Sequence, residues 1–488
     1  MQEKLKSIRD NFRGMVEDAL KVRDVRTPDE RREDGKKLRE TTPIESHGTW
    51  EAPVNRPDPV ALLKEQGVSR VQALLPLRYE RMSVSAFTFY RGGALIMASD
   101  LSGTPSTGIK VQACGDAHIS NFGFFNSPER RTVFDINDFD ETSIGPWEWD
   151  VKRLAASVEI CGRDRAFSKK ERKAAVLASV KGYREAMEEY ANMGHQEVWY
   201  SHLDVDDLLL KFSGQMNKKE KKAAEKIMKK AKRKNSARAI TKLTEVKDGK
   251  LRIISAPPAI IPMRDMAEEA GNTGLYDIIG IERIIKQALS GYRKTLSPER
   301  RKLVEQYYGV DMGVKVVGVG SVGTRALIVM MEGADRNDPL VLQIKEAQES
   351  VLERFCGRSR FDQHGKRVVE GQRAMQTVGD PLLGWCRLPD VGGLPKDYYV
   401  RQLWDGKGSI DLDFISAKNL KVLAEVCGAT LAHAHARTGD RFEIAGYLGK
   451  DDAFDKAILE FARAYADQNE IDYARFMEAL ESGELDVK

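Results

Sequence analysis

Apolar residues recur every three to four positions over most of this chain, and one internal region breaks that pattern. The helical period predicts helices at both ends of the chain, over 59–82, 85–102, 146–164, 169–193 and 416–488. Between about 312 and 405 the pattern changes to glycine-punctuated, β-branched runs such as VKVVGVGSVGTRALIVMMEG, which predict strands. Shorter strands are predicted at 108–114 and around 239–263.

The order of these elements predicts an α+β protein with two lobes. At 488 residues the chain exceeds the size at which a single core stops growing. Because residues 25–58 are rich in charge, proline and threonine, they predict an extended arm. We therefore expect an N-terminal helix and extended arm (1–58), a mainly helical lobe (59–311), a β-rich lobe (312–405) and C-terminal helices that complete the helical lobe (406–488).

Composition narrows the classes of partner. Hydrophobic residues make up 41% and charged residues 31% of the chain, and no apolar run is long enough to predict a signal peptide or a membrane span. Five cysteines without a CxxC spacing favour a reduced, cytoplasmic protein. The run 216–235 carries ten Lys or Arg against two Glu, which we interpret as a solvated helix face. With a net charge of only +4, a nucleic-acid partner is not favoured.

Carboxylates gather in the stretch GDAHISNFGFFNSPERRTVFDINDFDET (115–142), which holds four aspartates and three asparagines between short apolar runs. Carboxylates beside strands lose hydration and repel one another unless cations or hydrogen bonds compensate them. A bound divalent metal would supply that compensation. The plain alternative is a solvated hairpin, because Asp and Asn are common turn formers and Asp135 could simply face water.

The first half of this stretch has the spacing of a phosphotransfer loop. Asp116 precedes Asn121 by five residues, as the catalytic base precedes the metal-binding amide in such loops. The segment resembles small-molecule kinases of the aminoglycoside phosphotransferase type, in which a histidine often stands at the position of His118. The resemblance implies that Asp116 and His118 are catalytic and that Asn121 binds metal. Cys114 departs from it, because those kinases normally have histidine there.

The second half resembles the IDFD segment of the same kinases. The resemblance implies Asp138 as the main ligand of the magnesium that bridges the nucleotide phosphates, and Asp140 as a second carboxylate. Asp150, in WEWDVKRLA, then matches a buried helix aspartate that braces the catalytic loop through backbone hydrogen bonds.

A glycine-rich hairpin is predicted far downstream. Gly318, Gly320 and Gly323 form GxGxxG around Ser321 between two strand-like runs, whereas a dinucleotide-binding fingerprint would open a helix. Lys345 ends the next apolar run, like the strand lysine that pairs with nucleotide phosphates. Read alone, these residues are equally well a tight hairpin and a strand-end lysine.

Two further features complete the nucleotide site implied by this resemblance. The lysine needs an acidic partner from a helix, and both Glu353 and Glu370 are candidates, of which we prefer Glu370. The segment DYYVRQLWDGKGS resembles the hinge between kinase lobes, which would bring backbone groups near Gln402 and Leu403 to an adenine edge.

The motif order is rotated, with the catalytic loop before the glycine loop, so we infer a circularly permuted kinase-like fold. In that reading 420–440 takes the place of the helix before the catalytic loop; alternatively, 85–102 fills it. The segments RPDPVALLKEQ, LLPLRYERM, FYRGGALIMASDL, QACGDAHISNFGFF, FDINDFDET, GPWEWDVKRLAAS and VVEGQRAMQ together resemble the bacterial family catalogued as domain of unknown function 2252. Membership implies the wider kinase-like superfamily and no established substrate.

The function we expect is phosphotransfer from ATP, with Mg²⁺ or Mn²⁺, to a hydroxyl of an unknown small molecule or protein. Three alternatives stay open: a nucleotide-binding pseudoenzyme or scaffold, a nucleotidylyl transferase on the same fold, and a nucleic-acid binder that uses the lysine run. Arg78, Arg81 and Arg91 either contact phosphate or an acidic substrate or form surface salt bridges. His433 and His435 are two apart on a helix, so we interpret them as packing or surface residues.

Overall fold

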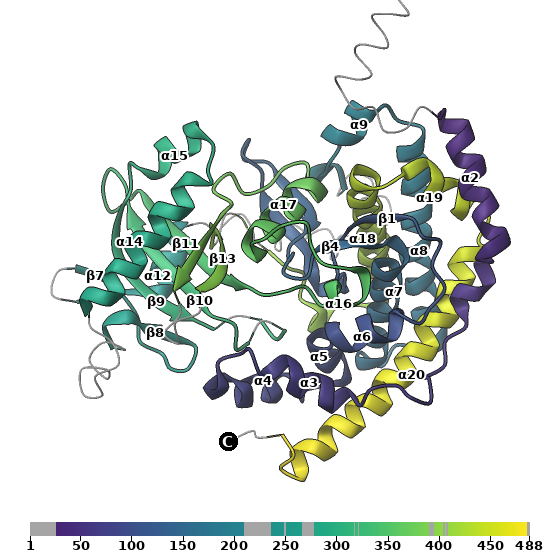
Figure 1. Ribbon diagram of the computed structural model, residues 1–488, viewed down its shortest axis with the longest axis horizontal. Helices are drawn as coiled ribbons and strands as arrows, with labels where there is room; N and C mark the ends of the chain where they lie inside the picture. Colours follow the sequence, from purple (N-terminus) through teal and green to yellow (C-terminus); the bar gives the residue numbers. More distant parts are fainter. Residues whose placement is uncertain are drawn as a thin grey trace, which may run out of the picture.

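The computed structural model describes residues 26–208, 236–247, 250–265, 278–316, 318–320, 322–389, 395–403, 406 and 408–485. A helical lobe and a smaller lobe built on one large sheet lie side by side, as the α+β prediction requires (Figure 1). The predicted N-terminal helix and the lysine-rich run 216–235 lie outside the described residues. Among the described helices, none has both the length and the apolar composition needed to cross a membrane.

Helices from both ends of the chain form the helical lobe. They are α2 (Pro28–Thr41), α3 (Pro59–Gly67), α4 (Leu75–Met82), α5 (Ala86–Gly92), α6 (Ala94–Leu101), α7 (Trp147–Asp164), α8 (Lys169–Ala191), α9 (His195–Tyr200), α18 (Ala417–Thr438), α19 (Arg441–Leu448) and α20 (Ala453–Glu481), with short 3₁₀ turns at Ile44–Gly48, Gln72–Leu74, Ile119–Asn121 and Leu412–Phe414.

Helix α7 is the centre of this lobe, since nearly all of its residues are buried. Its Trp147 is fully buried and stacks on Tyr183 of α8, with ring centroids 5.6 Å apart. Helix α8 begins at a capping box in which Ser168 and Glu171 satisfy each other's backbone N–H groups. The long α8 and α18 then pack against each other so closely that a Cβ on Gly428 would lie 1.9 Å from the backbone oxygen of Ser179.

The prediction of an extended arm is wrong for residues 28–41, which form α2. Thr27 caps this helix in a capping box with Glu30, and a proline stands in its first turn. Its Gly35 lies against the backbone of Glu443 in α19. Many charges did not prevent the helix, because it lies along the outside of the lobe with its polar side facing water (Figure 1).

The second lobe is a six-stranded antiparallel sheet in the order β12-β13-β11-β10-β9-β8. Its strands are β8 (Ile260–Pro262), β9 (Tyr308–Lys315), β10 (Ala326–Glu332), β11 (Pro339–Ala347), β12 (Gly384–Pro389) and β13 (Pro395–Gln402), beside a small hairpin of β6 (Thr244–Lys247) and β7 (Lys250–Ile253). The lobe therefore starts earlier than the predicted boundary at 312. Its helices are α12 (Ser236–Leu243), α14 (Ile278–Lys294), α15 (Pro298–Val304), α16 (Glu353–Cys356) and α17 (His364–Met375).

Alternation along the strands explains why both faces of this sheet are covered. Val329 and Met331 of β10 share a core with Tyr292 of α14, while the preceding Ile328 packs with Leu243 of α12. Burial on both faces accounts for the long apolar runs that predict these strands.

Short strands on the helical lobe hold the carboxylate stretch. β1 (Lys110–Ala113) pairs with β4 (Ser143–Pro146), and β2 (Phe122–Asn126) pairs with β3 (Thr132–Ile136), which also pairs with β5 (Leu203–Asp204). The C-terminal end of α18 lies directly beside β1: Gln112 donates its backbone N–H to the Thr438 hydroxyl at 3.2 Å. Residues 438 and 112 are thus neighbours in space although 326 positions apart.

Candidate functional site

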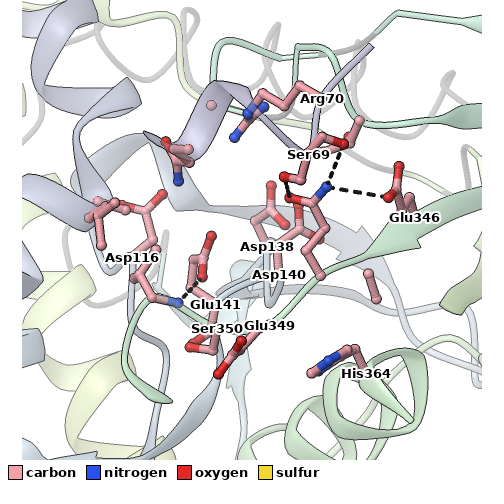
Figure 2. A pocket seen from close by; sticks show the side chains of 18 of the residues that line it. Ser69, Arg70, Asp116, Asp138, Asp140, Glu141, Glu346, Glu349, Ser350 and His364 are labelled. Carbon is pink, nitrogen blue, oxygen red and sulfur yellow. Dashed lines mark hydrogen bonds between the residues drawn. The ribbon is translucent and has the colours of Figure 1, made fainter. Parts of the chain in front are cut away.

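A cavity of about 670 Å³ lies between the two lobes. Its helical-lobe wall includes the proposed catalytic and metal residues, and its sheet-lobe wall includes the glycine loop between β9 and β10 (Figure 2). From the residues singled out in the sequence, the structure brings to this cavity Asp116, His118, Asn121, Asp138, Asp140, Gly318 and Gly320.

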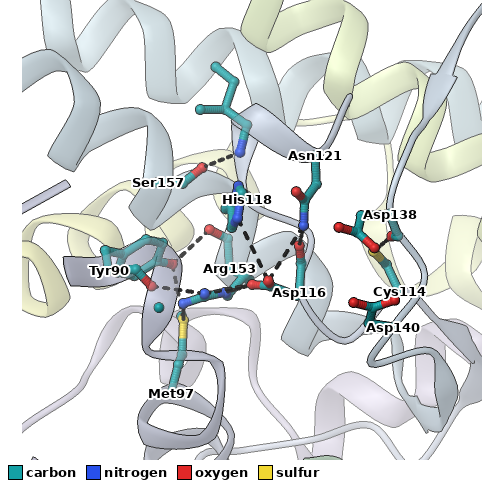
Figure 3. Close-up of polar contacts among 12 residues, drawn as sticks. Tyr90, Met97, Cys114, Asp116, His118, Asn121, Asp138, Asp140, Arg153 and Ser157 are labelled. Carbon is teal, nitrogen blue, oxygen red and sulfur yellow. Dashed lines mark hydrogen bonds and ion pairs between the residues drawn. The ribbon is translucent and has the colours of Figure 1, made fainter. Parts of the chain in front are cut away.

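Asp116 is held in a fixed orientation at the cavity wall (Figure 3). Its Oδ1 accepts hydrogen bonds from Nε and Nη2 of Arg153 at 2.9 and 2.6 Å. Burial raises the pKa of Asp116, and the Arg153 guanidinium limits that rise. Arg153 is itself buried, under the ring of Tyr90. A bidentate arginine on one oxygen leaves Oδ2 directed toward the other residues of the loop.

Two loop neighbours surround that second oxygen. His118 Nε2 lies 3.6 Å from Asp116 Oδ2, and burial, together with Arg91 and Arg153, lowers the pKa of His118 well below its usual value. The imidazole is therefore neutral at pH 7. Asn121 Nδ2 donates to the backbone oxygen of Asp116 at 2.7 Å, which leaves the amide oxygen as its acceptor atom.

Asp150 braces the loop, as the sequence analysis expects. Its carboxylate accepts the backbone N–H groups of Cys114 and Gly115 at 2.6 and 2.9 Å. Buried His435 adds a contact of 3.2 Å from α18, and its other ring nitrogen lies 2.9 Å from the Tyr183 hydroxyl. His435 is therefore a structural residue that links α18 to the loop. Cys114 itself contributes only its backbone N–H to Asp150.

Lys345 lies on β11 of the sheet lobe and contacts two aspartates, Asp138 and Asp140. We call residues 138–140 the DFD segment. The Lys345 ammonium contacts Asp140 Oδ2 directly and lies 3.7 Å from Asp138 Oδ1. The Tyr399 hydroxyl donates to the other oxygen of Asp140 at 2.7 Å. Burial opposes ionisation here, but Lys345 and Tyr399 outweigh it and lower the pKa of Asp140 to about 2. Burial also disfavours the ammonium, and the two carboxylates overcome that effect and raise the pKa of Lys345.

Neither Glu370 nor Glu353 forms the expected ion pair with Lys345. Glu370 pairs with Arg373 at 3.0 Å, one turn along α17. Glu353 is buried and pairs with Arg367 at 3.3 Å. Because the sheet lobe packs against the DFD segment, Asp140 rather than a glutamate contacts the Lys345 ammonium. Asp140 is therefore an ion-pair partner of Lys345 rather than a free second metal ligand.

Helix α17 instead contributes an arginine to the site. Arg367 is almost fully buried, and its guanidinium donates to the backbone oxygens of Asp140 and Gln348 at 2.8 Å each and also to that of Thr142. Five N–H donors in one plane suit this role. The arginine thus fixes the path of the DFD segment from the sheet lobe.

The glycine loop is held against helices of the other lobe. Arg81 donates to the Gly318 oxygen at 2.6 Å, and the Gly323 oxygen accepts the backbone N–H of Val71 at 2.8 Å. Gly318 and Gly323 have φ of +71° and +90°, which favour glycine. Ser321 lies outside the described residues, so its predicted role has no structural counterpart.

Gln402 and Leu403 do not line the main cavity. The N–H of Gln402 donates to Asp380 at 2.5 Å, and that of Leu403 donates to the Val341 oxygen at 2.9 Å. The Asp380 side chain occupies the first N–H, and continued pairing with β11 beyond the end of β13 occupies the second. The expected adenine contact through these two amides is therefore not available.

The donor set fits a metal that arrives with phosphate better than a metal bound by protein alone. In the described parts of the chain no group of three or more His, Cys, Asp or Glu side chains could hold an ion. Asp138 Oδ1 is nevertheless buried without a hydrogen-bond donor, and Asn121 lines the same cavity. Magnesium typically takes one or two carboxylates and completes its shell with water and substrate phosphates.

Several residues of the site lie beyond the reach of the sequence patterns. Arg153, Tyr399 and Arg367 contact the proposed residues, but the sequence analysis gave them no role, although Arg153 and Tyr399 lie inside segments that it quotes. The sequence did indicate Arg91 as a candidate contact of the site, because it stands in an arginine-rich segment before the catalytic loop. Asp135, for which the solvated-hairpin alternative would require exposure to water, is buried, and burial raises its pKa to about 7.

Fold and cavity define an α+β protein with a carboxylate-rich site between two lobes. The chain belongs to a bacterial family described as uncharacterized proteins conserved in bacteria, domain of unknown function 2252, whose family model matches residues 70–479. No curated protein and no solved structure matches the chain.

Proposed function

We propose that the chain is an ATP- and Mg²⁺-dependent phosphotransferase acting on a hydroxyl group. One observation carries the proposal: Asp116, Asn121 and Asp138 share a single cavity with the glycine loop, and Lys345 lies 3.7 Å from Asp138. Groups that touch the phosphates of one nucleotide have to converge within on the order of 15 Å. A solvated hairpin gives no reason for this convergence.

The side chains divide the work as follows. Asp116, oriented by Arg153, accepts the proton of the acceptor hydroxyl. Lys345 pairs with the nucleotide phosphates, and the glycine loop covers them with backbone groups. Asp138 Oδ1 and the Asn121 amide oxygen hold the metal. Mg²⁺ bound there would neutralise charge between the phosphates.

Chain topology supports a kinase-like fold with a rotated order. Glycine hairpin, lysine strand, helix α17 and two further strands follow one another along the chain, as such a small lobe requires. The end of α18 lies beside β1, where a helix that leads into the catalytic loop would end. A circular permutation accounts for both facts, because termini that meet at a surface can be rejoined elsewhere.

Thermal unfolding with and without metal tests the proposal. ATP with Mg²⁺ should raise the melting temperature of the wild-type protein, while ATP in excess EDTA should not, because the metal joins the phosphates to Asp138. Asp138→Asn should lose the effect, whereas Glu349→Gln, an exposed carboxylate on the same cavity, should keep it. Equal stabilisation in EDTA would reject the metal assignment.

A second candidate, transfer of the nucleotidyl group, is favoured by the shape of the cavity. Its lining includes Glu346, His364 and Asp397 but neither Gln402 nor Leu403. A nucleotide whose base lies near these residues would bind with its phosphate chain in the opposite direction to that of a nucleotide in a kinase. ATP labelled at the α- or γ-phosphate, incubated with a cell extract, separates the candidates: transfer of the γ-label supports the kinase and transfer of the α-label the nucleotidylyl transferase. Nucleotide binding with neither transfer indicates a pseudoenzyme.

A further inference from the structure

Two arginines on the cavity wall have no carboxylate partner. Arg70 is 7% exposed; it donates to the Val322 oxygen at 2.5 Å, and its Nε has no acceptor. Arg91, at the end of α5, forms no hydrogen bond or ion pair with any residue that the structure describes, and its Nε is buried. Both residues line the main cavity (Figure 2 labels Arg70).

Two other buried guanidinium groups of this lobe are compensated by carboxylates, whereas fully buried Arg78, which does not line the cavity, donates among the described residues only to Gln66 and to the Gly92 oxygen. Arg56 forms two bidentate ion pairs, with Asp100 and Asp472 at 2.6–2.8 Å, and Arg153 pairs with Asp116. A buried charge without a partner is costly. Burial lowers the pKa of both Arg70 and Arg91. Carboxylates act on them only through longer-range electrostatics, which does not fully offset the effect of burial. An anionic ligand in the cavity would remove this imbalance.

The two arginines lie on either side of the glycine loop. A Cβ on Gly323 would be 3.0 Å from the Arg70 side chain, and a Cβ on Gly320 would be 3.4 Å from the Arg91 backbone oxygen. Asp116 is the carboxylate with the largest electrostatic effect on Arg91. Arg91 also lines a second cavity of about 540 Å³, on the side of Ser120. An anion held here would therefore lie between the glycine loop and the proposed catalytic base.

We propose that Arg70 and Arg91 form an anion subsite that binds a phosphate-type oxyanion beside Asp116. The subsite deepens the proposed function and rests on it for the identity of the ligand. Two sources supply the same chemistry: the terminal phosphate of the nucleotide, or an anionic group on the acceptor that enters past Arg91.

Titration calorimetry of the full chain in Mg²⁺ distinguishes these sources. The ligands are ATP, ADP, and inorganic phosphate added to the ADP-saturated protein, each tested on wild type, Arg70→Gln and Arg91→Gln. Loss of a charge-assisted contact should weaken binding about tenfold or more. If the nucleotide is the source, ATP binding weakens and ADP binding stays within twofold. If the acceptor is the source, both nucleotides are unaffected and phosphate binding is lost.

Two controls keep the outcome specific. Arg354→Gln removes an exposed arginine that lines the same cavity and pairs with Glu65, so all titrations should stay within twofold of wild type. Arg91→Lys should recover part of the affinity that Arg91→Gln loses. Should Arg70→Gln fail to fold, Arg91→Gln carries the test, because the Arg91 guanidinium makes no hydrogen bond or ion pair with the described residues.

The subsite is overturned if folded Arg70→Gln and Arg91→Gln bind all three ligands within twofold of wild type. A wild-type protein that binds no nucleotide in Mg²⁺ would instead reject the proposed function. Tripolyphosphate without nucleotide then tests the subsite alone: binding that both variants lose supports it, and no binding overturns it.

Discussion

Neighbouring carboxylates in and beside the DFD segment differ in charge behaviour because they meet different partners. Asp140 contacts Lys345 and Tyr399, and its pKa is lowered to about 2. Glu141 accepts one backbone N–H, from Val351 at 2.8 Å, and burial raises its pKa to about 7. At neutral pH the first is fully ionised and the second is half protonated. Partner and burial, rather than residue type, set the charge of each group.

Lys345→Met should abolish productive nucleotide binding. The change removes the cation that we propose to pair with the nucleotide phosphates and leaves Asp138 and Asp140 without their partner, so stability should also fall, by about 3–5 kcal/mol. Calorimetry with Mg²⁺ and ATP, together with urea denaturation, measures both effects. Tyr399→Phe is the matched control, because it deletes one hydrogen bond to Asp140, about 1 kcal/mol, and keeps the charge. Unchanged ATP turnover in a folded Lys345→Met protein would reject the lysine role.

Glu141→Gln should flatten the pH dependence of stability between pH 4.5 and 7. The folded-state pKa of Glu141 lies above its ordinary value, so the native state binds the extra proton in this range and the free energy of unfolding falls as pH rises. The slope should decrease by on the order of 1–3 kcal/mol over the range. Urea denaturation at several pH values measures it, with Glu349→Gln as an exposed control. A residual slope is expected, because the pKa of Asp135 is raised in the same way.

At the scale of elements, the β9–β10 hairpin depends on its glycines for both shape and position. Gly323 has a positive φ and touches the Arg70 side chain. The hairpin is anchored to the helical lobe at Gly318 through Arg81 and at Gly323 through Val71. Each anchor uses a backbone oxygen, so the conformation of the loop decides whether both can form.

Gly323→Ala should weaken both the hairpin and nucleotide binding. A Cβ at this position is strained by φ and crowds Arg70, which should cost about 1–3 kcal/mol. Gly309→Ala in β9 is the matched control, since a Cβ there meets nothing within 4 Å. Thermal melting with and without Mg²⁺ and ATP reports both effects. If the two variants behave alike, the loop conformation does not matter for the site.

At the scale of the whole molecule, the N-terminal arm is part of the helical lobe. Arg56 lies in the arm and pairs with Asp100 of α6 and with Asp472 of α20, which lies 416 residues further along the chain. All three side chains are largely buried. Residues up to 69 lie outside the family match, yet Arg56 among them forms buried ion pairs with the helical lobe.

Arg56→Met should destabilise the entire lobe. The change leaves two buried carboxylates facing each other, and removal of one partner from such a pair costs about 3–5 kcal/mol. The midpoint of urea denaturation should fall accordingly. Lys64→Met, which removes a largely exposed pair with Glu484, should change stability by less than about 1 kcal/mol. A midpoint equal to that of Lys64→Met would show that the arm is dispensable.

The sequence by itself determined most local elements and the residues of the two motifs. Helical periodicity marks α7, α8 and α18, and β-branched apolar runs mark β10 and β11, because each signal depends on side chains a few positions apart. The expected brace by Asp150 is likewise local, since the loop and the start of α7 are linked by short strands. The sequence pattern predicted an extended arm where the capped helix α2 forms, because that helix is rich in charged residues. It also placed the start of the sheet lobe too late in the chain.

Tertiary structure alone decided which residues meet. Lys345 pairs with Asp140 across 205 positions, while the expected partner Glu370 turns to Arg373 on its own helix. Arg70 and Arg91 come to the glycine loop without a carboxylate of their own. The physical reason is that an ion pair depends on the distance between two folded segments, whereas periodicity depends only on neighbours along one. The sequence therefore indicated the chemistry of the cavity, and packing of the two lobes chose the partners of each charge.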